Sequence, residues 1–562
     1  MLELNLLKMK RYIAALLFTA ILCFDASAQQ TENRNIQFDV HKEHITAEAL
    51  RTHLEILASD SLMGRGTGQK GKELAVDYLV AHLYKAGFPK IGEDNTFFQH
   101  FDLMANRMEF VDYTLTNSES EEEVWSARAK SGEPASFSTT LGGQLAIEGN
   151  IVFGGFGLMD DDSGINHMAD VTASGNWVLV FGDVPTDVDG MPENINELVS
   201  NRVRNLFFRS RATGILVINH FDNEEYEEES LNLSRLIGKP TGIRLPERGG
   251  RGGFAAAVKS VSPEMAVKLL GLESKQDLKN LHAVISNDVI GFRGAETGFK
   301  LSSKPSVVES VIPSVNIMGF LEGCHEELKD EIIVLSAHYD HMGIGAPDET
   351  GDMIYNGADD NGSGTVTTLL LAEVLKEAQR QGDCLDRSLL FLFVAAEEHG
   401  LLGSRYYSDN PVFPIENTVA NFNLDMFGRV DYEYQETDDK YIYIIGAEII
   451  SSTLDSLLHV ANERSVNINL DMRYNDLDDR NQFYRRSDHW NFGRLGVPFI
   501  FFFSGLHDNY HQPSDTVDLI AFDQLEKRAQ LIYTTLIEVA NAPKRPVVDN
   551  QEFINRTRQN PR

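Results

Sequence analysis

Carboxylate and imidazole side chains follow several apolar runs in the C-terminal half of the sequence, at points where predicted strands end. They are His338 and Asp340 after residues 331–337, Asp359 and Asp360 before a predicted helix, Glu397 and Glu398 near the end of 389–396, Asp425 within 420–426, and His511 after 497–503. Each motif alone is typical of a solvated loop. Together, the carboxylates would repel one another and lose hydration at a buried sheet edge, and a divalent cation would remove both penalties. The pattern therefore predicts a metal site.

Ligands of these types suit a pair of zinc ions. Two histidines and three carboxylates, one of them shared, can bind two divalent ions and leave room for water. Nitrogen and oxygen ligands without sulfur favour zinc, with manganese or cobalt as substitutes. The three cysteines, Cys23, Cys324 and Cys384, are too few for a cysteine-rich site. Water between two cations loses a proton near neutral pH and can attack a carbonyl, provided that a carboxylate that binds no metal accepts the proton.

The segment that must position these groups alternates strands and helices from residue 314 onward. Strands are predicted at 331–337, 389–396, 420–426 and 497–503, and helices at 364–378 and 523–540. Continuous apolar strands that alternate with helices indicate an α/β fold with a mostly parallel central sheet sandwiched by helices. In such sheets ligands bind beyond the carboxyl ends of the strands, which is where the candidate residues lie.

The rest of the sequence indicates a catalytic domain interrupted by an insertion. Residues 45–88 have helical periodicity around a glycine-rich turn at 64–68, which we interpret as a helix connection. A small β-rich insertion is indicated by β-type runs at 150–153, 177–181, 215–218, 255–258 and 283–290. The expected organisation is a signal peptide at 1–28, a catalytic domain at 41–141 and 301–542, an inserted domain at 142–300 and a loose tail at 543–562.

The motifs resemble those of the co-catalytic zinc aminopeptidases and carboxypeptidases related to bacterial leucyl aminopeptidase and glutamate carboxypeptidase II. The matching segments are 337–340, 357–364, 396–398, 424–426, and His511 with Asp515 four residues later. The resemblance covers most of 45–87 and 314–540. The insertion is similar to a protease-associated domain, most clearly at 212–217.

The resemblance implies a ligand set for two zinc ions. One ion would be bound by His338, Asp360 and Asp425, and the other by Asp360, Glu398 and His511. Asp360 would bridge the ions. It is preferred over Asp359 because the family's bridging aspartate stands three residues before the serine of a Ser-Gly pair, here Ser363.

The same resemblance implies the catalytic roles. Glu397 would be the general base and would later protonate the leaving amine. Asp340 would orient His338, the usual support for a ligating imidazole. Tyr510, just before the last ligand, would help to polarise the substrate carbonyl. The implied activity is removal of N-terminal residues from peptides by an aminopeptidase.

Charge and the N-terminus bear on partners and localisation. The formal net charge of −34 argues against nucleic acid as a partner, because an acidic surface repels phosphates. Basic residues precede an apolar run at 12–24, and Ala26-Ser27-Ala28 follows, as in a cleavable signal peptide. The run is shorter than the ~20 residues of a membrane span. We expect a periplasmic or secreted protein without a stable membrane anchor, in an oligomeric state that the sequence leaves open.

Three other interpretations stay open. A glutaminyl cyclase-like enzyme shares several of these ligands, although such enzymes typically lack the inserted module. A carboxypeptidase for acidic peptides needs a basic pocket, for which Arg485 and Arg486 are candidates. A receptor-like relative without catalysis would have lost ligands or the base, all of which are present here. The sequence also leaves open the preferred terminal residue and whether Cys324 pairs with Cys384.

Overall fold

The computed structural model describes residues 35–559, apart from 142–144, 187–193, 236, 248–256, 346–347, 349 and 438–439. The chain divides into two compact units, Met1–Asp102 with Pro313–Arg562, and Leu103–Ile312. The second unit interrupts the first in sequence, with wider bounds than the range 142–300 expected for the insertion. The expected signal peptide lies outside the described residues. Within those residues, no helix has both the length and the hydrophobicity that a membrane span requires.

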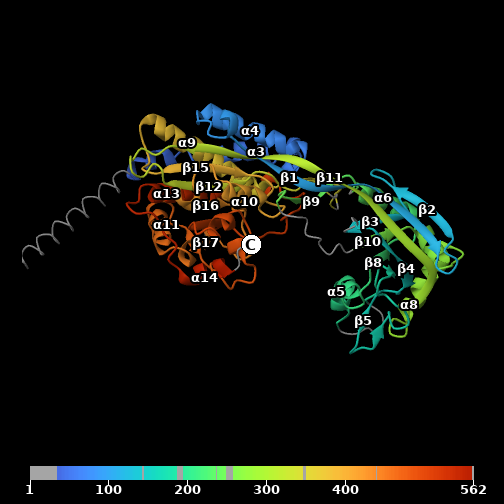
Figure 1. Ribbon diagram of the computed structural model, residues 1–562. Coiled ribbons are helices and arrows are strands. Elements are labelled where there is room, and N and C mark those ends of the chain that lie inside the picture. The colour runs from blue at the N-terminus through green and yellow to red at the C-terminus, as the bar shows by residue number, and fades with distance from the viewer. Residues whose placement is uncertain are drawn as a thin grey trace, which may run out of the picture. The chain divides into compact units, whose positions relative to one another are not determined.

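The first unit is built on a mostly parallel sheet, as predicted (Figure 1). Its strands, in spatial order, are β18 (Asn469–Asp471), β17 (Tyr441–Gly446), β19 (Phe499–Phe503), β16 (Thr418–Leu424), β12 (Ile332–His338), β15 (Ser388–Val394) and the end of β11 (Ala295–Leu321). The pairs β12–β15, β12–β16 and β16–β19 are parallel. Every residue of β12, β15 and β16 is buried, which explains why these strands are continuous apolar runs.

Helices cover both faces of this sheet. Helix α9 (Gly364–Gln381) packs on β12, β15 and β16, and α3 (Ala47–Leu57) and α4 (Lys70–Ala86) pack on α9. On the opposite face, side chains of α10 (Leu402–Asp409) and α12 (His489–Gly493) share a core with alternate residues of β12 and β15. Helices α2 (Asp39–Lys42), α11 (Ser452–Arg464) and α13 (Phe522–Ala540) complete the layers. The α/β sandwich predicted from the sequence is therefore confirmed.

The C-terminal segment differs from the expected loose tail. Residues Gln551–Gln559 form helix α14, whose Phe553 is only 1% exposed and packs in a core with Phe499 and Trp490. Asn550 accepts a hydrogen bond from the backbone N–H of Phe553 at 3.2 Å. Arg556 also donates to the Leu477 carbonyl at 3.0 Å. One buried aromatic residue and one polar contact leave no periodic pattern in a polar sequence.

The second unit, described by itself, also combines strands with helices. From β11 the strand order is β4 (Ile147–Phe153), β7 (Trp177–Phe181), β8 (Gly214–Ile218), β10 (Ala257–Val261) and β3 (Phe137–Leu141). The β4–β7, β7–β8 and β8–β10 pairs are parallel. Strand β1 (Phe98–Asn117) pairs with β2 (Glu123–Ala129), β9 (Pro240–Arg244) and β11, and β5 (Met159–Asp160) pairs with β6 (Ile165–Asn166). The helices are α5 (Ile195–Phe208), α6 (Asn223–Ser234), α7 (Pro263–Leu269) and α8 (Lys275–Asn287).

One predicted β-type run of this unit is wrong. Residues 283–290 belong to the end of α8 and the turn after it. The helix begins at a favourable cap, because the Ser274 side chain accepts a hydrogen bond from the N–H of Asp277. Leu278 and Ile285, two helical turns apart, are its buried residues. The run at 255–258 overlaps β10, and its first two residues lie outside the part of the chain that the structure describes.

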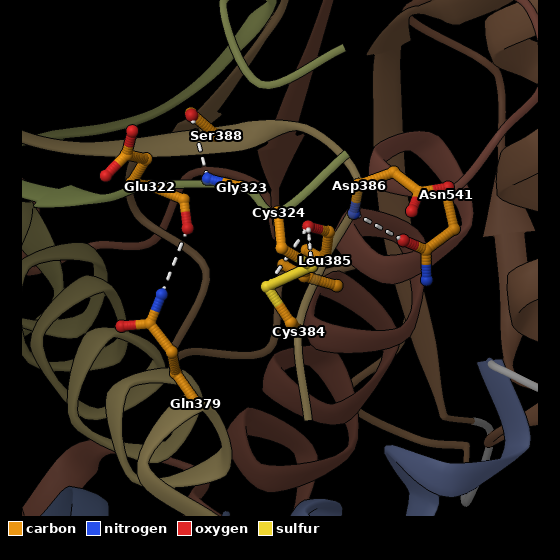
Figure 2. Close-up of a disulfide and its surroundings, with 9 residues drawn as sticks. All are labelled: Glu322, Gly323, Cys324, Gln379, Cys384, Leu385, Asp386, Ser388 and Asn541. Atoms are coloured by element: carbon orange, nitrogen blue, oxygen red, sulfur yellow. Dashed lines mark hydrogen bonds between the residues drawn. A yellow bond between two sulfur atoms is a disulfide. The ribbon is translucent and has the colours of Figure 1, made fainter. Parts of the chain in front are cut away.

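A disulfide joins Cys324 and Cys384 in the first unit (Figure 2). Their Cα atoms lie 6.1 Å apart, within the usual range for a disulfide, and the bridge closes a loop of 60 residues. It connects the segment after β11 to the segment between α9 and β15. The Cys324 N–H also donates to the Leu385 carbonyl at 2.9 Å. The pairing that the sequence left open is therefore present.

Candidate metal centre

The end of β12 presents His338 to two carboxylates from neighbouring segments. Its Nε2 lies 3.3 Å from Asp360 Oδ1 and 3.4 Å from Asp425 Oδ1. His338 Nε2 and Asp425 Oδ1 are buried and have no hydrogen-bond partner among the described residues. An orphaned imidazole nitrogen facing orphaned carboxylate oxygen has the donor set of a zinc site. The arrangement therefore fits a divalent cation.

A second trio lies on the other side of Asp360. His511 Nε2 is 3.0 Å from Asp360 Oδ2 and 3.1 Å from Glu398 Oε2. The two oxygens of Asp360 thus face two different imidazoles. Burial tends to lower the pKa of His511, but Asp360 and Glu398 outweigh it and raise that pKa to about 10. A ligating imidazole is neutral, so a cation would take the place of the proton that these carboxylates favour.

Asp360 and its neighbour Asp359 contact different partners. Asp359 Oδ1 accepts the N–H of Gly428 at 2.6 Å, and its Oδ2 lies 3.3 Å from His507 Nε2. Asp360 instead contacts His338 and His511. Asp515 accepts both backbone N–H groups of this pair, at 2.9 and 3.1 Å, and so fixes the turn. Of the two aspartates, Asp360 is the one that lies between His338 and His511.

Glu397 lies beside the trios, slightly farther from the imidazole. Its Oε2 is 3.9 Å from His338 Nε2, beyond the distances of Asp360 and Asp425. Burial raises the pKa of Glu397 well above its ordinary value, and the charges of Glu398 and Asp425 add to this, against the opposing effect of His338. A carboxylate with an increased proton affinity next to a metal centre suits general-base chemistry.

Asp340 supports two parts of the site by different atoms. Its main-chain carbonyl lies 3.0 Å from His338 Nδ1, so the backbone orients the imidazole, where the sequence analysis expected the residue's side chain. The carboxylate instead accepts the N–H of Ala396 at 2.6 Å and the hydroxyl of Thr67. Ala396 has a φ of 58° and directly precedes Glu397. The Asp340 carboxylate therefore positions the turn that carries the candidate base.

Arg65, in the glycine-rich turn, connects the N-terminal segment to the metal-site loops. Its guanidinium is 1% exposed and donates to the carbonyls of Leu57, Tyr339, Asn356 and Gly357 at 2.6 to 2.9 Å. Burial lowers its pKa to about 10, and nearby carboxylates, Asp360 first, oppose that shift. The side chain therefore stays charged at neutral pH and offsets part of the negative charge. From its sequence the turn is predicted only to connect two helices, and this role of Arg65 is not predicted.

His341 is a second residue that the sequence analysis did not place in the site. Its Nδ1 lies 2.7 Å from Glu398 Oε1 and 3.9 Å from Asp360 Oδ2. The trio of His341, Asp360 and Glu398 could itself hold an ion. However, His341 Nδ1 is hydrogen-bonded to Glu398 Oε1, whereas His511 Nε2 has no hydrogen-bond partner among the described residues and lies at similar distances from both carboxylates. The signal was available, since His341 stands three residues after His338.

Gly357 allows the bridging turn to approach this imidazole. Its φ is +57°, and a Cβ there would lie 2.2 Å from the Asp360 carbonyl and 2.5 Å from the His341 ring. No larger side chain fits.

A pocket with both charged and apolar lining residues lies beside the two trios. It is lined by Asp360, Glu397, Glu398, Asp425, Met426, Phe483, Arg486, Ser487, Phe501, Phe503, Leu506 and Tyr510. Tyr510 lies in this lining, and its ring stacks on His511 at 3.8 Å between centroids. Ser487 donates to Asp425 Oδ2 at 2.6 Å and so orients a candidate ligand. Ser487 therefore both lines the pocket and contacts a candidate ligand.

Comparisons with known proteins agree with this chemistry. Residues 316–536 match peptidase family M28. Aminopeptidase YwaD of Bacillus subtilis is 28% identical over 240 residues, which are 42% of this chain and 46% of that protein. Probable aminopeptidase YDR415C of Saccharomyces cerevisiae is 26% identical over 217 residues, 38% of this chain and 54% of that protein. The chain thus spans about half the length of these curated relatives.

A solved structure is also similar. BSAP, a zinc aminopeptidase from Bacillus subtilis, aligns with 90% of this chain and 98% of its own, at 16% identity and a TM-score of 0.48.

Proposed function

We propose that this chain, whose residues 316–536 match peptidase family M28, is an exported di-zinc aminopeptidase. The observation that carries the proposal is the placement of Asp360, whose two carboxylate oxygens face His338 and His511 at 3.3 and 3.0 Å. His338 and Asp425 complete one proposed zinc site, and His511 and Glu398 the other. Glu397 lies beside these residues and is assigned to neither zinc site.

The zinc ions, when bound, supply the Lewis acidity that makes water a nucleophile near neutral pH and polarises the substrate carbonyl. Glu397 accepts the proton of the attacking water and returns it to the leaving amine. Asp340 holds the backbone before Glu397, and Ser487 holds Asp425. Tyr510, at the pocket wall, is placed to hydrogen-bond the carbonyl oxygen of the substrate. Each residue thus positions a reacting atom or moves a proton.

The pocket supports a preference for apolar N-terminal residues. Its apolar lining residues are Met426, Phe483, Phe501, Phe503 and Leu506. Burying a leucine-sized side chain there contributes about 1.5–3 kcal/mol. An acidic side chain would be repelled by the carboxylates in the lining and could pair only with Arg486. We therefore propose substrates such as leucyl and phenylalanyl peptides.

A carboxypeptidase for acidic peptides receives less support. The sequence offered the pair Arg485–Arg486 for that pocket, but only Arg486 lines it. Arg485 donates instead to Gln482 and lines a different hollow, with Tyr484 and Arg556. Recognition of two carboxylates requires more donors than one guanidinium supplies.

Export and domain organisation are further parts of the proposal. The N-terminal sequence has the features of a signal peptide, and the Cys324–Cys384 disulfide suits an oxidising compartment. We propose that the unit Leu103–Ile312 contains the inserted domain, supported by the likeness of 212–217 to protease-associated domains.

The proposal is tested with purified protein on aminoacyl p-nitroanilides and on the same compounds with a blocked amino group. We expect cleavage of leucyl and phenylalanyl substrates, weak cleavage of glutamyl ones, and loss of activity in a chelator that zinc restores. Equal cleavage of N-blocked substrates would overturn the aminopeptidase assignment. Activity that resists chelation would overturn the zinc mechanism.

A further inference from the structure

A second group of metal-binding side chains lies on the helical layer. His53 of α3, His82 of α4 and Glu373 of α9 converge there from three helices. His82 Nδ1 is 2.7 Å from Glu373 Oε1, and His53 Nε2 is 3.7 Å from Glu373 Oε2. The two imidazole centroids are 5.0 Å apart. None of these residues belongs to the site described above.

The spacing of these atoms is close to that of a tetrahedral zinc site. One ligand atom from each residue can be chosen so that all three lie within 4.8 Å of one another. Zinc–ligand bonds of about 2.0–2.1 Å at tetrahedral angles place neighbouring ligand atoms about 3.3 Å apart. The observed 2.7 and 3.7 Å lie on either side of that value. The two distances involve different oxygens of Glu373, so coordination of one ion requires small shifts of the side chains.

His53 is already oriented for coordination. Its Nδ1 lies 2.8 Å from the Tyr78 hydroxyl, which leaves Nε2 directed at Glu373. A hydrogen bond on the far nitrogen is the usual support of a ligating imidazole. Burial chiefly lowers the pKa of His53, and His82 and Lys85 act in the same direction against Glu373.

We propose that His53, His82 and Glu373 form an additional divalent-cation site, with the ligand chemistry of zinc. Three protein ligands leave a fourth position for water. The side chains of His82 and Glu373 are 24% and 27% exposed, so an ion can enter from solvent. The site connects α3, α4 and α9 through one ion, and α9 begins at Gly364, directly after the turn that carries Asp360. Its role is therefore structural: it fixes the helix that supports the catalytic turn.

Metal counting on the full chain tests this site separately from the proposed catalytic one. Wild-type protein and Glu373→Gln are dialysed against buffered free zinc, and bound zinc per chain is measured by mass spectrometry. We expect Glu373→Gln to bind one zinc ion per chain fewer than wild type, whatever number wild type binds. Glutamine can still accept the hydrogen bond from His82, so the variant keeps the packing. His82→Ala gives a second variant in case the first retains weak binding.

Two controls separate the outcomes. His459→Ala removes an exposed histidine that lies 3.8 Å from Asp455, a comparable pair outside the cluster, and should leave the count unchanged. Asp360→Ala should lose zinc from the catalytic centre and keep the equivalent that Glu373→Gln loses. If Asp360→Ala bound as much zinc as wild type, the proposed function would be overturned, whereas the proposed site on the helices would not be affected.

Tyr78→Phe provides a graded test of the orientation. Loss of its hydroxyl should weaken zinc binding at this site about 10–100-fold without removing a ligand. The proposal is overturned if Glu373→Gln and His82→Ala both bind as much zinc as wild type at every free-zinc concentration.

Discussion

The two clusters of histidine and carboxylate in the first unit differ in charge and burial. The strand-end cluster brings the carboxylates of Asp360, Glu397, Glu398 and Asp425 together in a largely buried space. The helix cluster has one carboxylate, Glu373, between two imidazoles and is partly open to water. Similar residue types are therefore held in two very different electrostatic environments.

The difference shows why one cluster needs a cation and the other can exist without one. Buried carboxylates that repel one another destabilise the fold unless a positive charge lies among them. A half-exposed carboxylate with imidazole neighbours is already hydrated and hydrogen-bonded. We expect zinc at the strand ends to be essential for activity, and zinc on the helices to contribute only to stability.

The largest effect is expected for Glu397→Gln. Loss of the general base should lower kcat by about 10²–10⁴-fold, while the zinc content stays that of wild type. The measurements are steady-state kinetics and metal analysis, with Glu463→Gln, an exposed glutamate of α11, as the matched control. A variant that lost zinc would show Glu397 to be a ligand.

The same variant also tests the electrostatic side of the comparison. Burial raises the pKa of Glu397 well above its ordinary value, so ionisation of this carboxyl is less favourable in the folded protein than in the unfolded chain. At neutral pH Glu397 therefore lowers the free energy of unfolding. In the presence of a chelator, Glu397→Gln should therefore unfold at a higher denaturant concentration than wild type. If the denaturant midpoint of Glu397→Gln were lower than that of wild type, the charge of Glu397 would not destabilise the folded state.

Opening the disulfide should have the next largest effect, on stability alone. The bridge closes a 60-residue loop, so Cys324→Ser with Cys384→Ser should lower the free energy of unfolding by about 4 kcal/mol. Neither cysteine contacts either cluster, so kcat and zinc content should match wild type. Denaturant unfolding with and without reductant measures the change, and wild type in reductant should behave like the variant. An unchanged midpoint would show that the loop is held by other contacts.

The sequence predicts the role of a residue where that residue or its contact partners form a recognisable sequence pattern. Strand ends were predictable, because fully buried parallel strands are continuous apolar runs and His338 follows one of them directly. The role of Arg65 was not predictable, because this side chain binds backbone carbonyls such as that of Asn356. Every residue has a backbone carbonyl, so no sequence pattern marks the partner. The helix cluster was missed for a related reason, because His53 and Glu373 are 320 residues apart and each is an ordinary residue on a helix.

A smaller loss of activity is expected for Asp340→Asn. The asparagine can still accept one hydrogen bond, but the N–H of Ala396 loses a charged acceptor beside the candidate base. We expect kcat to fall about 10–100-fold with KM and zinc content nearly unchanged. Thr67→Val removes the other donor to this carboxylate and should have a weaker effect in the same direction. If Asp340→Asn lost zinc, the main effect of the substitution would be on His338 and not on the turn before Glu397.

The smallest effect is expected for Glu373→Gln when zinc is absent. The carboxylate is 27% exposed, so its removal in a chelator should change the free energy of unfolding by less than about 1 kcal/mol. At free zinc 100-fold above the dissociation constant of the helix site, wild type should gain about 2.7 kcal/mol from that site, and the variant should lack this gain. Denaturant unfolding of both proteins, with Asp360→Ala added to each to remove the catalytic contribution, isolates the difference. An equal response to zinc would mean that the helix cluster binds no ion, and that only the charge excess at the strand ends recruits one.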